Sequence, residues 1–195
     1  MAKLYFKYGA MNSGKTALLL QAAYNYEERG MKVYIIKPSC DTKGKKKIVS
    51  RIGLSREIDL LLQKEDSIYQ EIAKLEKIPS CIFVDEAQFL SSKQVDELMQ
   101  IVVKLNIPVL CYGLRTDFQT NGFEGSKRLL EIAHCIEEMK TICNCGKKAI
   151  FNARKIGKKY VVDGEQIAID DKENLSYEAM CAKCYYTKVK KNTKD

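Results

Sequence analysis

The sequence predicts an α/β fold: a parallel sheet flanked by helices, followed by a small appendage. Up to about residue 135, short β-branched runs alternate with longer helical patterns, and such alternation is typical of a parallel sheet with right-handed crossovers. After about Thr141 the pattern changes to short, lysine-rich pieces bounded by two pairs of cysteines. We therefore expect one large domain and a smaller C-terminal unit.

Short apolar runs mark the strands. Those beginning at Cys81 and Val109 are apolar throughout, as expected for strands covered on both faces. Cys81 and Cys111 lie inside these runs, where cysteine behaves as a small hydrophobic residue. The predicted strands are Leu4–Tyr8, Val33–Lys37, Cys81–Val84, Val109–Tyr112 and Cys135–Met139.

Longer amphipathic patterns predict the helices between these strands. Ser91 and Gln94 can form a capping box, and Gly30 suits a left-handed helix C-terminus. No helix is predicted after Thr141. The predicted helices are Lys15–Arg29, Ser67–Lys77, Ser92–Asn106 and Ser126–Ala133.

The composition is that of a globular protein. Of the 195 residues 46% are hydrophobic and 30% charged, which excludes wholesale disorder. No apolar run approaches the roughly 18 to 20 residues that a membrane-spanning helix needs, and the first residues lead into a strand rather than a signal peptide. We expect a cytoplasmic protein without a membrane partner.

The net charge of +8 favours anionic partners. The basic residues gather in three clusters, which we interpret as solvated surface in preference to a nucleic-acid-binding face. The clusters are Lys147, Lys148, Arg154, Lys155, Lys158 and Lys159; Lys43, Lys45, Lys46 and Lys47; and Lys188, Lys190, Lys191 and Lys194.

A phosphate-binding motif follows the first predicted strand. Residues 9–16 read Gly-Ala-Met-Asn-Ser-Gly-Lys-Thr, which fits G-x-x-x-x-G-K-(S/T) between a strand and a helix. In such a loop backbone N–H groups surround phosphate oxygens. Lys15 would reach the β- and γ-phosphates and Thr16 would ligate Mg²⁺, so the domain is predicted to be P-loop NTPase-like. The predicted ATP- and phosphate-binding residues are Gly9, Ala10, Met11, Asn12, Ser13, Gly14, Lys15, Thr16, Asp85 and Gln88.

Two acids end the apolar strand Cys81–Val84. They lie at the carboxyl edge of the predicted sheet, where ligands of α/β proteins bind. Asp85 is the predicted second magnesium ligand. Glu86 can either orient water, as in an ATPase, or accept a proton from an acceptor hydroxyl, as in a kinase. The phosphate loop does not decide between the two reactions.

Four of the eight cysteines are paired. Cys143 and Cys145 are separated by 35 residues from Cys181 and Cys184. Four thiolates can complete a tetrahedral Zn²⁺ site with no position open to water, which is a structural arrangement. We prefer this site to four free thiols because the segment between the pairs is too polar to form much of a core.

Three separated segments resemble the thymidine kinase family of tetrameric, zinc-containing enzymes: Val84-Asp85-Glu86-Ala87-Gln88-Phe89, Tyr112-Gly113-Leu114-Arg115-Thr116-Asp117-Phe118-Gln119, and the paired cysteines. With the phosphate loop they occur in the family's order. The organisation predicted is an ATP-binding α/β domain over 1–140, a zinc-binding lasso domain over 141–187 and a disordered basic tail over 188–195.

The resemblance implies the reaction and its residues. Glu86 would be the general base that accepts the proton of the thymidine 5′-hydroxyl as it attacks the γ-phosphate of ATP. The lasso would cover thymidine, and its Ile169-Asp170-Asp171 replaces a glycine pair common in the family. A homotetramer and feedback inhibition by dTTP are also implied. The implied nucleoside-binding residues are Met11, Phe89, Leu114, Phe118, Phe123, Ile167, Ala168, Ile169 and Tyr177.

Alternatives remain open. Residues 85–88 also resemble the D-E-x-x box of helicases, but a nucleic-acid motor generally needs two ATPase lobes, and one lobe uses nearly all of this chain. Another nucleoside kinase is possible because pocket shape sets specificity, and deoxyuridine is a plausible second substrate. Arg51 and Arg115 are candidates for phosphate contacts, Lys43 replaces a common arginine, and His134 is interpreted as structural.

Overall fold

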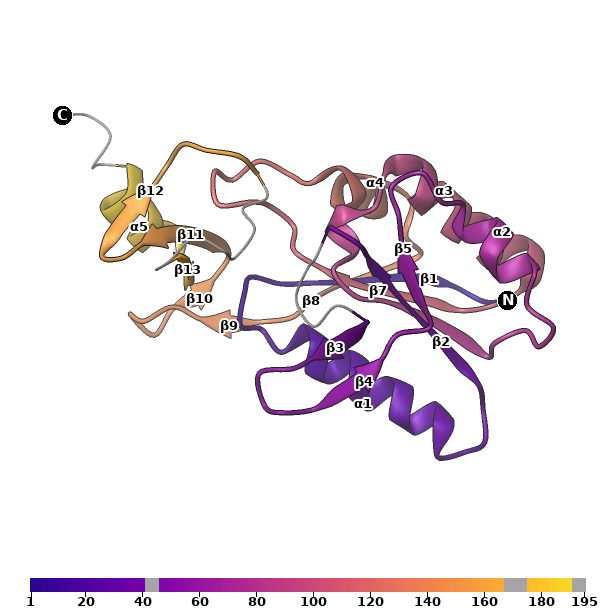
Figure 1. Cartoon of the computed structure of the whole chain (residues 1–195). Coiled ribbons are helices and arrows are strands. Elements are labelled where there is room, and N and C mark those ends of the chain that lie inside the picture. Colours follow the sequence, from indigo (N-terminus) through magenta and orange to yellow (C-terminus); the bar gives the residue numbers. More distant parts are fainter. Residues whose placement is uncertain (41–45, 167–174, 191–195) are drawn as a thin grey trace.

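A six-stranded, all-parallel sheet forms the centre of the molecule (Figure 1). The computed structural model describes residues 1–40, 46–166 and 175–190. The strand order is β5-β2-β6-β7-β1-β8, and it confirms the predicted fold class. The strands are β1 (Leu4–Tyr8), β2 (Val33–Pro38), β5 (Leu60–Leu62), β6 (Cys81–Val84), β7 (Val109–Gly113) and β8 (Cys135–Glu138).

Helices cover both faces of this sheet (Figure 1). One face packs against α1 (Lys15–Glu27), beside the hairpin of β3 (Lys47–Val49) and β4 (Ser55–Glu57). The other face carries α2 (Ile68–Ala73), α3 (Ser92–Gln100) and α4 (Glu124–Ile132). Cys81 and Cys111 are fully buried in these two cores, as predicted. Within the described part of the chain, no helix combines the length and the apolar character needed to cross a bilayer.

The element boundaries agree closely with prediction in the strands and less closely in the helices. Ser91 and Gln94 form the predicted capping box, and Gly30 has the predicted left-handed conformation, with φ of 72°. The second predicted helix ends early, at Ala73. The third becomes a π-helical turn, η2 (Ile101–Leu105), after Gln100. Strands β3, β4 and β5 were not predicted because each has only three residues.

The C-terminal region, described over residues 141–166 and 175–190, lies beside the carboxyl edge of the large sheet (Figure 1). It contains a hairpin, a three-stranded antiparallel sheet in the order β12-β11-β13 and two short helical segments. These are β9 (Thr141–Ile142), β10 (Lys148–Ala149), β11 (Phe151–Ile156), β12 (Lys159–Val161), β13 (Leu175–Met180), α5 (Ala182–Tyr185) and η3 (Tyr186–Lys190).

Helical structure at the C-terminus corrects two predictions. We expected no helix after Thr141, yet α5 and η3 follow β13. Residues 188–190, assigned to a disordered tail, belong to η3. The reason is that Val189 and Tyr185 are each 1% exposed and pack in the core around the cysteines, a contact that the lysine-rich composition hides. Residues 191–195 lie outside the described residues.

Candidate functional site

The phosphate loop, residues 9–16, joins β1 to α1. Gly14 has φ of 76°, a conformation that glycine adopts without strain, and it precedes the first residue of α1. Lys15 is 8% exposed, and its Nζ donates to the carbonyl oxygens of Gly9 at 3.3 Å and Ala10 at 3.0 Å. Burial lowers the pKa of Lys15, and the carboxylates of Glu86 and Asp85 oppose that shift. The loop thus surrounds a cation beside two acids.

A hydroxyl and a carboxylate meet next to this loop. Asp85 directly follows β6 and is 5% exposed. The Thr16 hydroxyl, in the first turn of α1, donates to Asp85 Oδ2 at 3.4 Å. Hydroxyl and carboxylate oxygens are ligands that Mg²⁺ accepts in nucleotide sites. The two residues predicted to hold magnesium therefore fit that ion.

Glu86 has a left-handed backbone, with φ of 49° and ψ of 41°. Non-glycine residues rarely adopt this conformation, and those that do cluster at functional sites. Its Oε2 accepts a hydrogen bond of 2.6 Å from Gln88 Nε2, while Gln88 Oε1 accepts one of 3.0 Å from the Leu114 N–H. Gln88 is 2% exposed. A Cβ at Gly113 would lie 2.8 Å from Gln88 Oε1, so glycine leaves space for this amide.

Glu86 and Gln88 line two different cavities, one of about 310 Å³ and the other of about 350 Å³. Glu86 lines the smaller cavity together with residues 11–17, Arg51 and Leu114. Gln88 lines the larger one together with Phe89 and Phe123. The rings of Phe89 and Phe123 pack edge to face, with centroids 5.6 Å apart.

Arg51 and Arg115, the two candidates for phosphate contacts, lie in different surroundings. Arg51 lines the cavity of the phosphate loop, whereas Arg115 lies over the ring of Tyr8 at 5.7 Å. His134 is structural as predicted, because its Nδ1 accepts from the Leu4 N–H and its own N–H donates to the Leu4 carbonyl. Residues Ile167, Ala168 and Ile169, and also Lys43, lie outside the described residues.

The C-terminal region contributes polar residues that we did not predict for the site. Asn152, 3% exposed, accepts from the Met11 N–H at 2.7 Å and donates to the Thr116 carbonyl at 3.3 Å. The Tyr185 hydroxyl donates to the Phe118 carbonyl. Asn152 therefore links the phosphate loop to the nucleoside loop, the name we give to residues 114–123. No local sequence pattern marks these contacts, because all of them join distant segments.

Arg154 requires a correction. We interpreted it with its neighbouring lysines as solvated surface, but it is 4% exposed. Its side chain contacts Tyr177 and Phe118, two residues predicted to bind the nucleoside. Lys147, Lys158 and Lys159 are exposed as expected. The difference arises because Arg154 lies on β11, where it contacts Phe118 of the nucleoside loop, whereas Lys147, Lys158 and Lys159 lie outside this strand.

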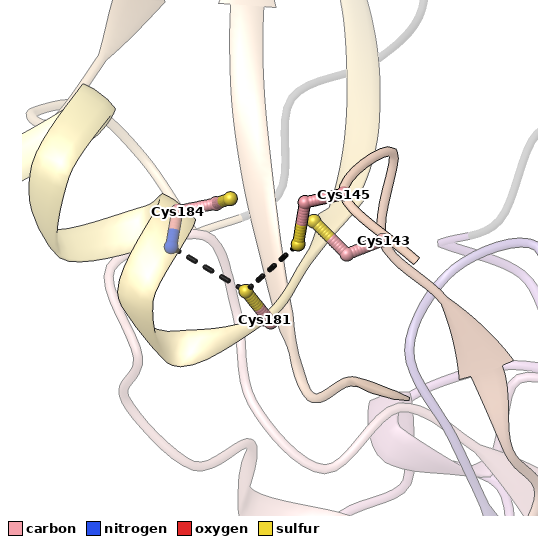
Figure 2. A group of neighbouring side chains, drawn as sticks. All are labelled: Cys143, Cys145, Cys181 and Cys184. Carbon is pink, nitrogen blue, oxygen red and sulfur yellow. Dashed lines mark hydrogen bonds between the residues drawn. The ribbon is translucent and has the colours of Figure 1, made fainter. Parts of the chain in front are cut away.

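The four paired cysteines converge (Figure 2). Cys143 and Cys145 lie on the turn between β9 and β10, and Cys181 and Cys184 lie at the start of α5. Their sulfur atoms all lie within 4.8 Å of one another. The Cys145 and Cys181 sulfurs are 3.5 Å apart, and Cys181 Sγ accepts from the Cys184 N–H at 3.5 Å. A turn and the start of a helix, far apart in sequence, thus present four sulfur ligands to one point.

The thiols differ in acidity. Burial opposes ionisation of Cys143, but backbone N–H groups of Cys145 and Cys181 lower the pKa of its thiol to about 6. The backbone N–H of Cys184 likewise lowers the pKa of Cys181. Contacts with the sulfurs of Cys145, Cys181 and Cys143 raise the pKa of Cys184 to about 12. Because neighbouring thiolates repel, a divalent cation is what allows all four to ionise, and this cluster can hold a metal such as zinc.

Comparison with known proteins agrees with this geometry. The family model described as thymidine kinase matches residues 2–185. A thymidine kinase of Pasteurella multocida (strain Pm70) is 51% identical over 193 residues, covering 97% of this chain and 99% of that protein. A thymidine kinase of Enterobacteria phage T4 is 46% identical over 194 residues, covering 98% and 99%. The chain therefore belongs to the thymidine kinase family and is an ATP-dependent nucleoside kinase.

Proposed function

We propose that this protein transfers the γ-phosphate of ATP to the 5′-hydroxyl of thymidine, giving dTMP. The observation that carries the proposal is the position of Glu86, which lines the cavity of the phosphate loop while its carboxylate is held by Gln88. An acid so placed lies beside the phosphates of a bound nucleotide. In the larger cavity, Phe89 and Phe123 provide aromatic surface of the kind against which a pyrimidine base packs.

Glu86 is the proposed general base. A primary hydroxyl is a poor nucleophile at neutral pH, and in a loose transition state it needs orientation and late deprotonation. The Gln88 amide donates to one carboxylate oxygen and leaves the other available to the acceptor hydroxyl. Because Gln88 is itself held by the Leu114 N–H, the position of the base is tied to the nucleoside loop.

The phosphate side of the reaction is assigned to residues 9–16. Lys15 would exchange its loop carbonyl partners for β- and γ-phosphate oxygens. Thr16 and Asp85 would hold magnesium, which neutralises charge on the phosphates when bound. Gln88, predicted from sequence to bind phosphate, is assigned instead to orienting Glu86, since its amide is engaged by Glu86 and Leu114.

The nucleoside side is assigned to Met11, Leu114, Phe89, Phe123, Phe118 and Tyr177, with Ile167, Ala168 and Ile169 carried as family expectations. Zinc held by the four cysteines would have a structural role, because four thiolates would leave no position for a substrate. The division into an ATP-binding unit over 1–140 and a zinc-binding unit from 141 stays part of the proposal. So do the homotetramer, inhibition by dTTP and the cytoplasmic location.

The test is a product assay with radiolabelled γ-phosphate. The protein is incubated with Mg-ATP and with thymidine, deoxyuridine, deoxycytidine or deoxyadenosine separately, and products are resolved by chromatography. We expect label in thymidine monophosphate, a smaller amount in deoxyuridine monophosphate and none in the purine product. Release of inorganic phosphate without a labelled nucleotide, above all with DNA present, would contradict the proposal and indicate an ATPase that acts on nucleic acid.

A further inference from the structure

A buried guanidinium connects the C-terminal region to the nucleoside loop. Arg154 lies on β11 and is 4% exposed. Nε donates to the Tyr177 hydroxyl at 3.0 Å, Nη1 to the Glu165 carbonyl at 2.8 Å and Nη2 to the Gln166 carbonyl at 3.1 Å. Burying a charge is costly unless it is hydrogen-bonded. Here each nitrogen of the group has a partner: a hydroxyl on the neighbouring strand β13 and two consecutive backbone carbonyls.

The flat face of the same group is also in use. The Arg154 Cζ lies 3.6 Å from the centroid of the Phe118 ring and 5.5 Å from that of Tyr177. Phe118 is 2% exposed. Only arginine combines a planar face that stacks on an aromatic ring with a fork of donors in that plane. A lysine at this position keeps the charge and loses most of the geometry.

Further hydrogen bonds hold the part of the nucleoside loop that contains Phe118. The Phe118 carbonyl accepts from the Tyr185 hydroxyl, so this residue is fixed at its backbone as well as at its ring. Gln166 Nε2 donates to Asp117 Oδ2 at 3.0 Å. Arg154 therefore lies at the centre of a set of contacts that orients Phe118 and Tyr177, two residues assigned to nucleoside binding. The phosphate loop contacts this region through Asn152 instead.

We propose that Arg154 is a positioning residue for the nucleoside: it holds Phe118 and Tyr177 in place and thereby sets the affinity for the acceptor without contributing to the binding of Mg-ATP. The inference rests on the proposed function, which takes these two residues as part of the nucleoside pocket. It predicts a separation that a general loss of stability does not produce. A partly unfolded enzyme loses active molecules, which lowers apparent kcat, whereas a displaced pocket wall raises the nucleoside KM.

The experiment compares Arg154→Met and Arg154→Lys with the full-length wild type, each checked for zinc content and thermal unfolding. In R154M we expect the thymidine KM to rise about tenfold or more, with the ATP KM within about twofold and kcat within about threefold. R154K should fall between R154M and the wild type, and it also serves if R154M does not fold. The matched control is Lys155→Met, the next cation on the same strand, whose half-buried ion pair with Glu178, 3.6 Å long, involves neither Phe118 nor Tyr177.

Two outcomes overturn the inference: an unchanged thymidine KM in a folded, zinc-loaded Arg154 variant, or an equal rise in the KM values of thymidine and ATP. Phe118→Ala, measured in the same assay, separates this failure from that of the proposed function. If F118A raises the thymidine KM and the Arg154 variants do not, only the role of Arg154 is lost. If F118A also leaves the thymidine KM unchanged, the pocket assignment itself is wrong.

Discussion

The sheet edge and the C-terminal region hold their halves of the site by different means. Lys15, Asp85 and Glu86 follow or begin elements whose residues lie in two large apolar cores covering both faces of the sheet. The core around the cysteines comprises, among the described residues, nine buried positions: eight in the C-terminal region and Ala10 of the phosphate loop. Four of the nine are alanine and two are cysteine. Small side chains remove little apolar area from water.

This difference separates chemistry from recognition. The sheet edge is stable through burial, so a polar substitution there should change the reaction and leave the fold intact. The C-terminal region has a small core, a cysteine cluster that can hold a metal and a few long-range hydrogen bonds, so a change there should alter the binding of the nucleoside. The following variants test whether a change in one half of the site alters the reaction or the nucleoside binding assigned to that half alone.

The largest effect is expected at the sheet edge, for Glu86→Gln. The substitution keeps the size of the side chain and removes the proton acceptor, so kcat should fall about 100- to 10,000-fold. Binding of a fluorescent ATP analogue, measured by titration, should stay within about twofold because the phosphate loop is untouched. Glu131→Gln, a surface acid paired with Arg128, is the control. Near-normal turnover in E86Q would remove Glu86 from the role of base.

Loss of the metal is the next largest change and belongs to the other half. Cys181→Ser, or treatment of the wild type with a chelator, should release about one zinc per chain and unfold the C-terminal region, because apolar burial alone is too small to hold it. We expect the thymidine KM to rise at least about tenfold while the ATP analogue still binds. Metal analysis and limited proteolysis report the two effects. Wild type purified without any bound metal would contradict this account.

Asn152→Ala tests the contact between the two halves. It removes the acceptor of the Met11 N–H and the donor to the Thr116 carbonyl. Leaving such groups unsatisfied costs about 1–3 kcal/mol, so both the ATP KM and the thymidine KM should rise severalfold. This double effect contrasts with Arg154, two residues away on the same strand, where only the thymidine KM should change. Steady-state kinetics with each substrate varied in turn distinguishes the two patterns.

Gln88→Met tests whether the base must be held. The amide connects Glu86 to the Leu114 N–H, and methionine fills its volume without either hydrogen bond. We expect kcat to fall about tenfold, with both KM values within about twofold, because orientation is lost and the pocket walls remain. Unaltered kcat in a stably folded Q88M would show that Glu86 needs no such support.

The same contrast explains what the sequence could and could not predict. The phosphate loop and the strand ending in Asp85 and Glu86 are local patterns, and the structure has both where they were expected. Resemblance to the family supplied the predicted nucleoside-binding residues, and two of them, Phe89 and Phe123, line the larger cavity. The convergence of the cysteines was predicted from their pairing and from the polar composition of the segment between them.

The residues that join the halves escaped prediction for a physical reason. Asn152 and Arg154 gain their roles from partners more than ten residues away, and composition around them is dominated by exposed lysines. A buried arginine is indistinguishable from a solvated one until its strand is placed beside the nucleoside loop. Val189 was missed in the same way, since a single apolar residue among lysines gives no periodic signal.

The smallest effect should come from a purely structural feature of the sheet half. Ser67→Ala removes the side chain that accepts from the Gln70 N–H at the start of α2, which costs about 1 kcal/mol and lowers the melting temperature by about 2–4 °C in a domain of this size. Because α2 packs on the apolar core and Ser67 is not among the residues that line the two cavities of the site, kcat and both KM values should not change. A lower melting temperature without any change in the kinetics would show that the sheet half tolerates a small loss of stability. In the C-terminal half, whose core is small, we expect a similar loss to weaken the binding of the nucleoside.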